Sequence, residues 1–303
     1  MKARYLFQIV LLSAVWGISF LMMRVAMPTF PPLWIAALRC ALGAGLLATV
    51  MVVGGNRLPP RRLLPWLLLV AVLNNALPFT FFAWGERTVP SNIAAVLNAT
   101  TPIWALLLSM AVDRAVAGAA TIAGVLLSFT GVLMVVVSHA GSASVQGNPA
   151  GVVFGVLIIA LAAICYAVAT VVAKKKLRGL DPLGLATTQL SLAALILLPL
   201  ALGSTHPGPM RAGPVAAVAV LGFAGSGIAY LLYYRLLEHV SPTQVVAVTY
   251  LLPIWGLFWG SFAGEAITPA ACVGVAVTVA GLVLMNLRTG RSRPAVAGQP
   301  ERA

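Results

Sequence analysis

The chain consists of long apolar runs separated by short polar segments. Ten windows are apolar over about 20 residues, which is the length of helix needed to cross a bilayer. The windows cover residues 5–27, 32–53, 63–84, 91–112, 117–138, 151–173, 182–202, 214–235, 242–263 and 268–287. Because the runs are continuous rather than alternating, they indicate helices and exclude a membrane β-barrel. We therefore predict an all-α integral membrane protein with ten transmembrane helices.

The same pattern occurs twice, at an offset of about 150 residues. The matched positions are Trp16 and Tyr166, Arg24 and Lys174, Pro32 and Pro182, Arg39 and Gln189, Gly124 and Gly274, and Gly131 and Gly281. At an offset one residue longer, Thr101–Trp104 ("TPIW") matches Leu252–Trp255 ("LPIW"). The pattern predicts two five-helix domains, at residues 5–138 and 151–287. Five is an odd number, so the second domain enters the membrane from the opposite side, which makes the repeat inverted.

Basic residues are distributed unevenly between the two sides of this topology. If the N-terminus is cytoplasmic, fifteen of the 19 Lys and Arg fall on that side and three, Arg24, Arg87 and Arg211, fall on the other. The positive-inside rule then places both termini in the cytoplasm. The first window is too long for the hydrophobic region of a signal peptide, so we keep it as a helix. We expect a multi-pass protein of the plasma membrane, the inner membrane of a bacterium, with a disordered cytoplasmic tail at 288–303.

Composition supports this class and excludes others. Hydrophobic residues make up 61% of the chain and charged residues 8%, whereas a soluble domain carries about a quarter charged residues. The net charge of +13 does not indicate nucleic acid, because the basic residues lie scattered between apolar runs. Cys40, Cys165 and Cys272 fall in separate runs, and the three histidines share no ligand spacing. We therefore expect no disulfide, metal site or cofactor, and expect lipid and a small-molecule solute as partners.

Short motifs in both copies resemble those of a known family. Each copy opens with an aromatic first helix, "VWGISF" at Val15–Phe20 and "CYAVAT" at Cys165–Thr170, and the first copy carries "ALRC" in its second helix. The fourth helix of the second copy ends in Gly264 and Glu265, and glycine-spaced helices close both copies. In order and duplication these motifs resemble the EamA-type transporters of the drug/metabolite transporter superfamily over residues 5–287. The resemblance implies a solute site in a central cavity lined mainly by helices 1, 3, 4, 6, 8 and 9.

Two charged residues are candidates for gating or charge recognition. Arg39 lies well inside a span, where an ionisable side chain is a functional candidate. It can receive a substrate carboxylate, pair with Glu86 or extend to the interface. Glu265 ends the fourth helix of the second copy. The first copy has Val112–Arg114 at the corresponding place, so its acidic residue, Asp113, comes one position before the equivalent of Glu265. No Asp or Glu of the sequence falls at mid-membrane, which argues against an exchanger of protons for cationic drugs.

Aromatic and amide side chains fall at the middle of several spans. Trp16 and Tyr166 occupy the first and sixth helices away from the interfaces, where aromatic residues are usually concentrated. They either line a cavity or pack the bundle. Asn74 and Asn75 lie at the centre of the third helix, and their repeat partners fall in the glycine-rich run 222–227. Buried amides require hydrogen bonds, so this pair either faces a solute or bonds a neighbouring helix.

Polar residues also precede two matched prolines. Asn98 and Thr101 come before Pro102, and Tyr250 comes before Pro253. A proline inside a helix frees a carbonyl and bends the axis, so the two sites predict kinks that either serve binding and rocking or are purely structural. With a tyrosine of the eighth helix, the candidates for substrate binding are Trp16, Asn74, Asn75, Asn98, Thr101, Tyr166, Tyr230 and Tyr250.

These features predict a transporter of a small metabolite that works by alternating access. Asn, Thr and aromatic side chains suit amino acids or related zwitterions, and we expect their export. Export of drugs, nucleobases or other hydrophobic solutes is the alternative. The sequence carries no nucleophile–base motif, zinc helix or paired acids, so we do not expect an enzyme. A channel remains a further alternative that trans-stimulated flux would exclude, and the protein is a monomer or a homodimer.

Overall fold

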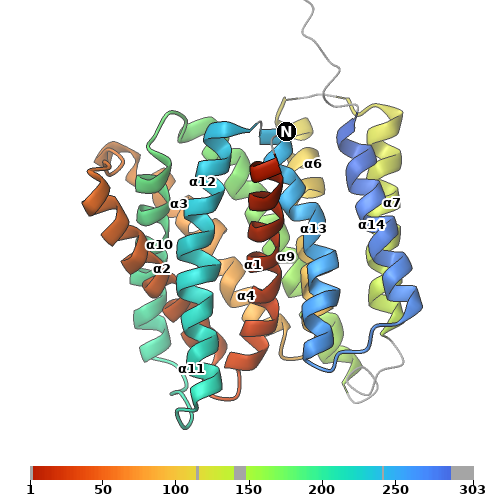
Figure 1. Cartoon of the computed structure of the whole chain (residues 1–303), viewed down its shortest axis with the longest axis horizontal. Coiled ribbons are helices and arrows are strands. Elements are labelled where there is room, and N and C mark those ends of the chain that lie inside the picture. The colour runs from red at the N-terminus through yellow and green to blue at the C-terminus, as the bar shows by residue number, and fades with distance from the viewer. Residues whose placement is uncertain (1–2, 114–115, 140–147, 241, 288–303) are drawn as a thin grey trace, which may run out of the picture.

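The computed structural model describes residues 3–113, 116–139, 148–240 and 242–287, and all regular elements in these ranges are helices. Eight helices are long and apolar enough to cross a membrane, and two shorter apolar helices cover Ala247–Phe262 and Pro269–Met285. Figure 1 shows them standing side by side. This is the architecture of a multi-pass membrane protein, as the apolar windows predicted. The tail predicted at 288–303 lies outside the described residues.

The elements fall into a first half (α1 to α7) and a second half (α9 to α14). The first half comprises α1 Ala3–Ala26, α2 Pro32–Gly54, the 3-10 turn η1 Arg61–Leu63, α3 Leu64–Ala71, the π-helix η2 Val72–Ala76, α4 Leu77–Gly85, α5 Ser91–Asn98, α6 Thr101–Asp113 and α7 Ala119–Ser138. The second half comprises α9 Pro149–Lys176, α10 Pro182–Leu202, α11 Ala212–Ala219, the π-helix η3 Val220–Ile228, α12 Ala229–His239, α13 Pro242–Phe262 and α14 Pro269–Leu287. Each predicted window falls on one of these helical segments, with small shifts at the ends.

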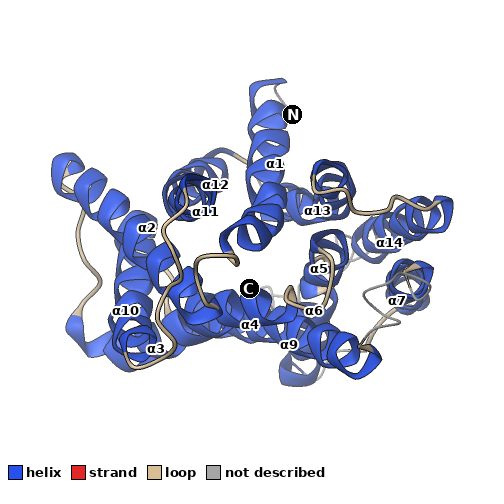
Figure 2. Ribbon diagram, turned by 90° about the horizontal axis from the view of Figure 1, so that it is seen from below, coloured by secondary structure: helices blue, strands red, loops and turns tan. Residues whose placement is uncertain are grey.

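The two closing helices pack against each other through small residues. Figure 2 shows α7 and α14 at one end of the elongated bundle, with α2, α3 and α10 at the other. A Cβ atom on Gly131 would lie 2.4 Å from the backbone nitrogen of Thr278, and one on Gly281 would lie 2.4 Å from the Ser128 hydroxyl. The Ser128 hydroxyl donates to the Thr278 carbonyl at 3.2 Å. Glycine is therefore required at this seam for the backbones to approach this closely.

The third helical segment of each half contains a π-helical stretch that the sequence did not predict. We expected continuous α-helix over 63–84 and 214–235, but η2 and η3 interrupt the α-helical hydrogen-bond pattern. Asn74 and Asn75 lie in η2, and Ser226 lies in η3. A π-helical stretch is rare and occurs often at functional sites, because the extra residue per turn redirects side chains and frees backbone groups.

The prolines of the two halves have different effects. In the first half, α5 ends at Asn98 and a new helix begins at Thr101, so the predicted kink at Pro102 is a complete break. The hydroxyls of Thr100 and Thr101 bond the carbonyls of Leu97 and Asn98, both at 2.7 Å, and thereby satisfy groups at the break. The second half has leucines at the matching positions, and α13 runs unbroken through Pro253.

Candidate functional site

A buried arginine connects the two halves near the middle of the bundle. Arg39 on α2 is 5% exposed. Its Nε donates to the Ser226 hydroxyl at 3.0 Å, and its Nη2 donates to the Gly225 carbonyl at 3.4 Å. The guanidinium also lies 3.9 Å from the centre of the Phe79 ring, which favours a cation electrostatically. The partners in these contacts are neutral, so none of them compensates the charge.

A second contact repeats this arrangement with the halves exchanged. The Asn74 amide nitrogen donates to Oε1 of Gln189 on α10 at 3.1 Å. Gln189 is the repeat partner of Arg39, and Asn74 is the repeat partner of Gly225. The second helix of each half therefore bonds the π-helical stretch of the other half.

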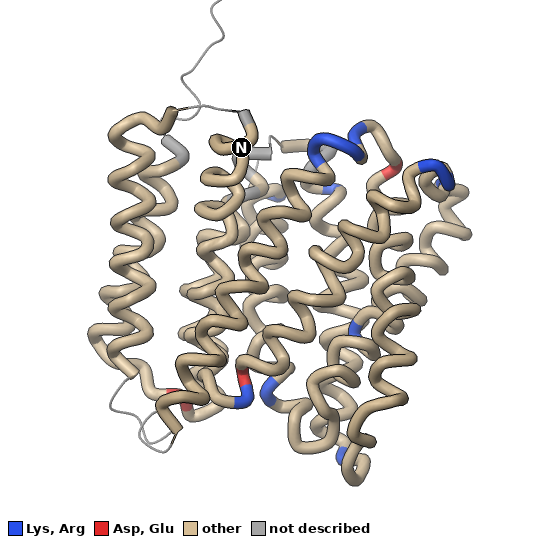
Figure 3. The backbone as a smooth tube through the Cα atoms, turned by 180° about the vertical axis from the view of Figure 1, so that it is seen from behind, with Lys and Arg blue, Asp and Glu red and all other residues tan. Residues whose placement is uncertain are grey.

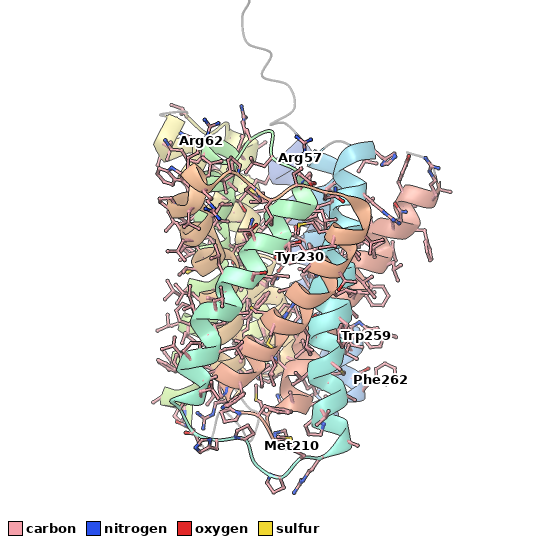
Figure 4. The ribbon with its side chains drawn as sticks, turned by 90° about the vertical axis from the view of Figure 1, so that its left-hand side faces the viewer. Arg57, Arg62, Met210, Tyr230, Trp259 and Phe262 are labelled. Atoms are coloured by element: carbon pink, nitrogen blue, oxygen red, sulfur yellow. The ribbon has the colours of Figure 1, made fainter. Side chains whose placement is uncertain are left out.

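Tyr230 on α12 links these two contacts. We call the set the polar cluster, and it comprises Arg39, Asn74, Asn75, Gln189, Gly225, Ser226 and Tyr230. The Tyr230 hydroxyl donates to Asn75 Oδ1 at 3.0 Å and lies 3.4 Å from the Asn74 amide nitrogen. Figure 4 places Tyr230 between Arg62 at one end of the bundle and Met210 at the other. Asn75 is fully buried, and its amide nitrogen has no hydrogen-bond partner. A buried donor without a partner is costly, so the cluster retains capacity to bind an acceptor group.

Arg39 carries the unbalanced charge of this polar cluster. It forms no ion pair within the described ranges, where the ion pair present joins Arg24 to Glu265. The alternative pairing with Glu86 is not formed, because neither carboxyl oxygen of Glu86 has a hydrogen-bond partner. Burial also excludes extension of the Arg39 side chain to the interface. Tyr166 lies within electrostatic reach of the guanidinium and stacks near Phe82, so it borders the cluster.

The remaining substrate-binding candidates lie in two other places. Trp16 packs beside Tyr233, with ring centres 5.7 Å apart, in an apolar cluster of α1, α12 and α13. The Thr101 hydroxyl bonds the carbonyl of Asn98 at the break between α5 and α6. Tyr250 packs near the same break, and its buried hydroxyl has no partner. The structure thus groups Asn74, Asn75 and Tyr230 around Arg39, and places these four candidates apart from them.

Glu265 ties together segments of both halves at one end of the bundle. Its Oε1 accepts a hydrogen bond from the Ser91 amide at 2.7 Å, and its Oε2 accepts one from the Asn92 amide at 3.0 Å. Arg24 at the end of α1 pairs with the same carboxylate at 3.3 Å. Residue 90, before α5, is a proline that offers no side-chain cap. A carboxylate at a helix N-terminus is stabilising, so Glu265 caps this helix from the other half.

We call this arrangement of Glu265, Arg24, Ser91 and Asn92 the Glu265 clamp. Figure 3 shows acidic and basic positions together at the end of the bundle opposite the N-terminus. Figure 4 places Arg57 and Arg62 at the other end, which we call the basic end. Lys176 lies there over the ring of Trp66. The basic end thus carries Arg57, Arg61, Arg62 and the last turn of α9 with Lys174, Lys175 and Lys176. The side chain of Asp113, the acid considered as a counterpart of Glu265, lies outside the described residues.

A pocket of about 440 Å³ opens at the clamp end between loops of both halves. The first half contributes residues 27–33, Trp84 and Arg87, and the second half contributes residues 204–206 and Gly208. The Gly208 amide donates to the Thr29 carbonyl at 2.7 Å, which holds the two loops together. This mouth of the bundle is therefore built jointly by the two halves.

Four residues of these sites were not among the sequence candidates. Gln189 and Ser226 were visible in the sequence as repeat partners of Arg39 and Asn75, so the offset was a signal for them. Phe79 carried no signal, because one aromatic residue among many apolar ones is unremarkable. Glu86 was considered only as a partner of Arg39, and nothing in the sequence signals its burial.

A helical bundle that buries polar groups between two similar halves has the architecture of a membrane transporter. A model of the EamA-like transporter family matches residues 3–137 and again residues 153–287. The chain belongs to this family, which confirms the resemblance seen in its motifs. Membership indicates transport rather than catalysis.

Individual relatives are consistent with this class. The chain is 26% identical over 286 residues to the "Uncharacterized inner membrane transporter YedA" of Escherichia coli K12, with 91% of this chain and 88% of that protein covered. It is 27% identical over 295 residues to the "Probable terminal-alkyne amino-acid exporter" of Streptantibioticus cattleyicolor, with 95% of each covered. A crystal structure that is 20% identical superposes with a TM-score of 0.66 over 97% of this chain and 100% of that chain, which shows the fold.

Proposed function

We propose that this protein moves a small metabolite carrying a carboxylate across the membrane, and that it exports amino acids or related zwitterions. The observation that carries the proposal is the buried guanidinium of Arg39, which is bonded to neutral partners. Burying a charge without compensation is costly. A substrate carboxylate supplies the missing charge and suits the guanidinium geometry.

The rest of the polar cluster suits the ammonium group of an amino acid. Carbonyl and hydroxyl oxygens of Gly225, Gln189 and Tyr230 are the acceptors that an ammonium needs. Phe79 and Tyr166 offer aromatic surface for an apolar side chain. The amino-acid exporter named among the relatives supports this substrate class.

We infer that the ten apolar segments form two inverted five-helix domains, over residues 5–138 and 151–287. The exchanged contacts of Arg39 and Gln189 support this, since a two-fold relation between inverted halves produces paired contacts of this kind. In alternating access, the clamp end and the basic end open in turn around the polar cluster. The π-helical stretches are suited to absorb the change, because their hydrogen bonds are already rearranged.

The orientation follows from the distribution of charge. We propose that the basic end faces the cytoplasm of a bacterial cell and that the clamp end faces outward, by the positive-inside rule. The six basic residues of the basic end and the inner membrane transporter among the relatives support this.

Flux from proteoliposomes tests the proposal. Vesicles carrying the full chain are loaded with labelled L-leucine, L-phenylalanine, adenine and the dye ethidium. We expect saturable, trans-stimulated release of amino acids that Arg39→Gln abolishes. Arg211→Gln, at an exposed residue, is the control and keeps full activity. Release of adenine or dye that Arg39→Gln leaves unchanged overturns the proposal in favour of the alternative solutes, and flux without trans-stimulation indicates a channel.

A further inference from the structure

A second buried ionisable group, Glu86, has no role in the site described so far. It directly follows the span that ends at Gly85 and is 2% exposed. Both carboxyl oxygens lack a hydrogen-bond partner. An ionised carboxylate in that position is costly, so burial favours the neutral acid and a nearby positive charge favours the ionised form. Burial raises the pKa of Glu86 well above its usual range, and the negative charge of Glu265 raises it further.

Glu86 lies between Arg39 and the Glu265 clamp. The Arg39 guanidinium covers the ring of Phe79. Glu86 follows seven residues later, which places it on the same face of the helix and about 10 Å further along the axis. Phe82 and Ala83 fill the face between them and are buried. Glu86 therefore lies where charge at the Arg39 site and charge at the clamp both act on it.

The charged groups that face Glu86 come from three neighbouring elements. Arg24 on α1, Arg39 on α2 and Glu265 after α13 all act on it electrostatically. Arg24 and Glu265 balance each other as an ion pair. On the α9 side, the contacts of the preceding Gly85 are with glycine and isoleucine, which carry no charge. Arg39 is thus the unbalanced charge that favours the ionised form of Glu86.

We propose that binding of a substrate carboxylate at Arg39 and uptake of a proton by Glu86 favour each other, so that the protein carries protons together with its substrate. This inference rests on the proposed function. The substrate carboxylate neutralises Arg39 and so removes the charge that favours ionised Glu86. By reciprocity, a proton on Glu86 strengthens substrate binding by the same factor.

The sign of this coupling distinguishes transport of a proton together with the solute from exchange of a proton for the solute. In an antiporter the proton and the solute compete, which requires a cationic group of the substrate next to Glu86. The ammonium of an amino acid bound at Arg39 faces the oxygens of Gly225, Gln189 and Tyr230, so it offsets part of the effect of the carboxylate on Glu86 and leaves its sign unchanged. Over about 10 Å, at an effective dielectric constant of about 20, one uncompensated charge changes proton affinity about tenfold. We therefore expect the affinity for L-leucine to rise by less than about tenfold as the pH falls through the titration of Glu86.

Proton movement during solute release tests the inference. Proteoliposomes are loaded with L-leucine, L-phenylalanine and a fluorescent pH indicator, without a pH gradient and with the membrane potential clamped by potassium and valinomycin. We expect amino-acid release to make the interior alkaline. Glu86→Gln, which mimics the neutral acid in shape, keeps release and loses the pH change. Asp181→Asn makes the same change at a carboxyl that caps α10, and keeps both.

The outcomes separate the two proposals. Wild-type vesicles that release no amino acid overturn the proposed function and the coupling together. Release with no pH change, release that acidifies the interior, or a pH change that persists in Glu86→Gln overturns the coupling alone. Binding of L-leucine to the purified protein gives a second measurement that needs no transport. Its affinity depends on pH in the wild type, and an equal dependence in Glu86→Gln contradicts the inference.

Discussion

The contact of Arg39 with η3 and the contact of Gln189 with η2 join equivalent elements through different chemistry. Each joins a second helix to the π-helical stretch of the other half. The Gln189 amide and Asn74 satisfy each other as neutral groups. Arg39 bonds a hydroxyl and a carbonyl and keeps an uncompensated charge. Two equivalent contacts thus differ by one charge, and under the proposed function that charge makes the contact of Arg39 the site of recognition.

Making both contacts charged has the largest expected effect. Gln189 is 5% exposed, and its described polar partner is an amide. Gln189→Arg places a second uncompensated cation there, so we expect the free energy of unfolding to fall by about 3–5 kcal/mol. Thermal unfolding in detergent measures this. Gln189→Met, of similar length and uncharged, is the control and costs less. A melting temperature for Gln189→Arg near that of the wild type contradicts the prediction.

Making both contacts neutral is expected to remove recognition and preserve the fold. Arg39→Gln gives each half the same second-helix residue. Charge-assisted hydrogen bonds to the substrate carboxylate are lost, so L-leucine affinity falls about 100-fold. Equilibrium binding measures this, and an unchanged melting temperature confirms an intact fold. If affinity stays close to that of the wild type, the charge of Arg39 is not what recognises the substrate.

Removing the hydroxyl that joins the two asparagines has an intermediate effect. Tyr230→Phe leaves Asn75 Oδ1 without its donor and deprives Asn74 of one acceptor. We expect a loss of stability of about 1–1.5 kcal/mol, measured by thermal unfolding. Tyr234 stacks on Tyr230 with ring centres 6.1 Å apart, and Tyr234→Phe serves as the matched control with a smaller loss. Equal losses in the two variants argue against the hydrogen bonds as the cause.

Trimming one neutral partner of Arg39 has the smallest effect. Ser226→Ala removes the acceptor of Nε, while the Gly225 carbonyl and the Phe79 ring remain. We expect a loss of stability of about 1 kcal/mol or less, and substrate affinity within about threefold of the wild type. Unfolding and binding measurements on the same preparation check both. A loss of affinity as large as that of Arg39→Gln shows instead that Ser226 binds the substrate directly.

The apolar pattern was sufficient to predict the helices, because membrane crossing imposes length and composition on each segment. The repeat offset also identifies Gln189 as the position equivalent to Arg39 from the sequence alone. The π-helical stretches were not predictable, since the hydrogen-bond register of a helix leaves no mark on its hydrophobicity. Pro102 and Pro253 have the same apolar context, so the sequence does not show that only the first lies at a break.

The grouping of site residues was less predictable. These helices are apolar on all sides, so the sequence does not show whether the side chain of Trp16 or Tyr250 points toward the centre of the bundle. Both lie away from Arg39. Glu86 was considered only as a partner of Arg39, and its burial beside Phe82 is not visible in the sequence. Depth in the membrane can be read from sequence, whereas rotation about a helix axis cannot.

The Glu265 clamp has a consequence for observing this protein at work. The amides of Ser91 and Asn92 are bonded by a carboxylate from the other half of the chain. Their exchange with deuterated solvent is slow while that carboxylate is in place and accelerates when it leaves. The exchange rates of these two amides therefore report, without any attached probe, the fraction of time for which the clamp is formed.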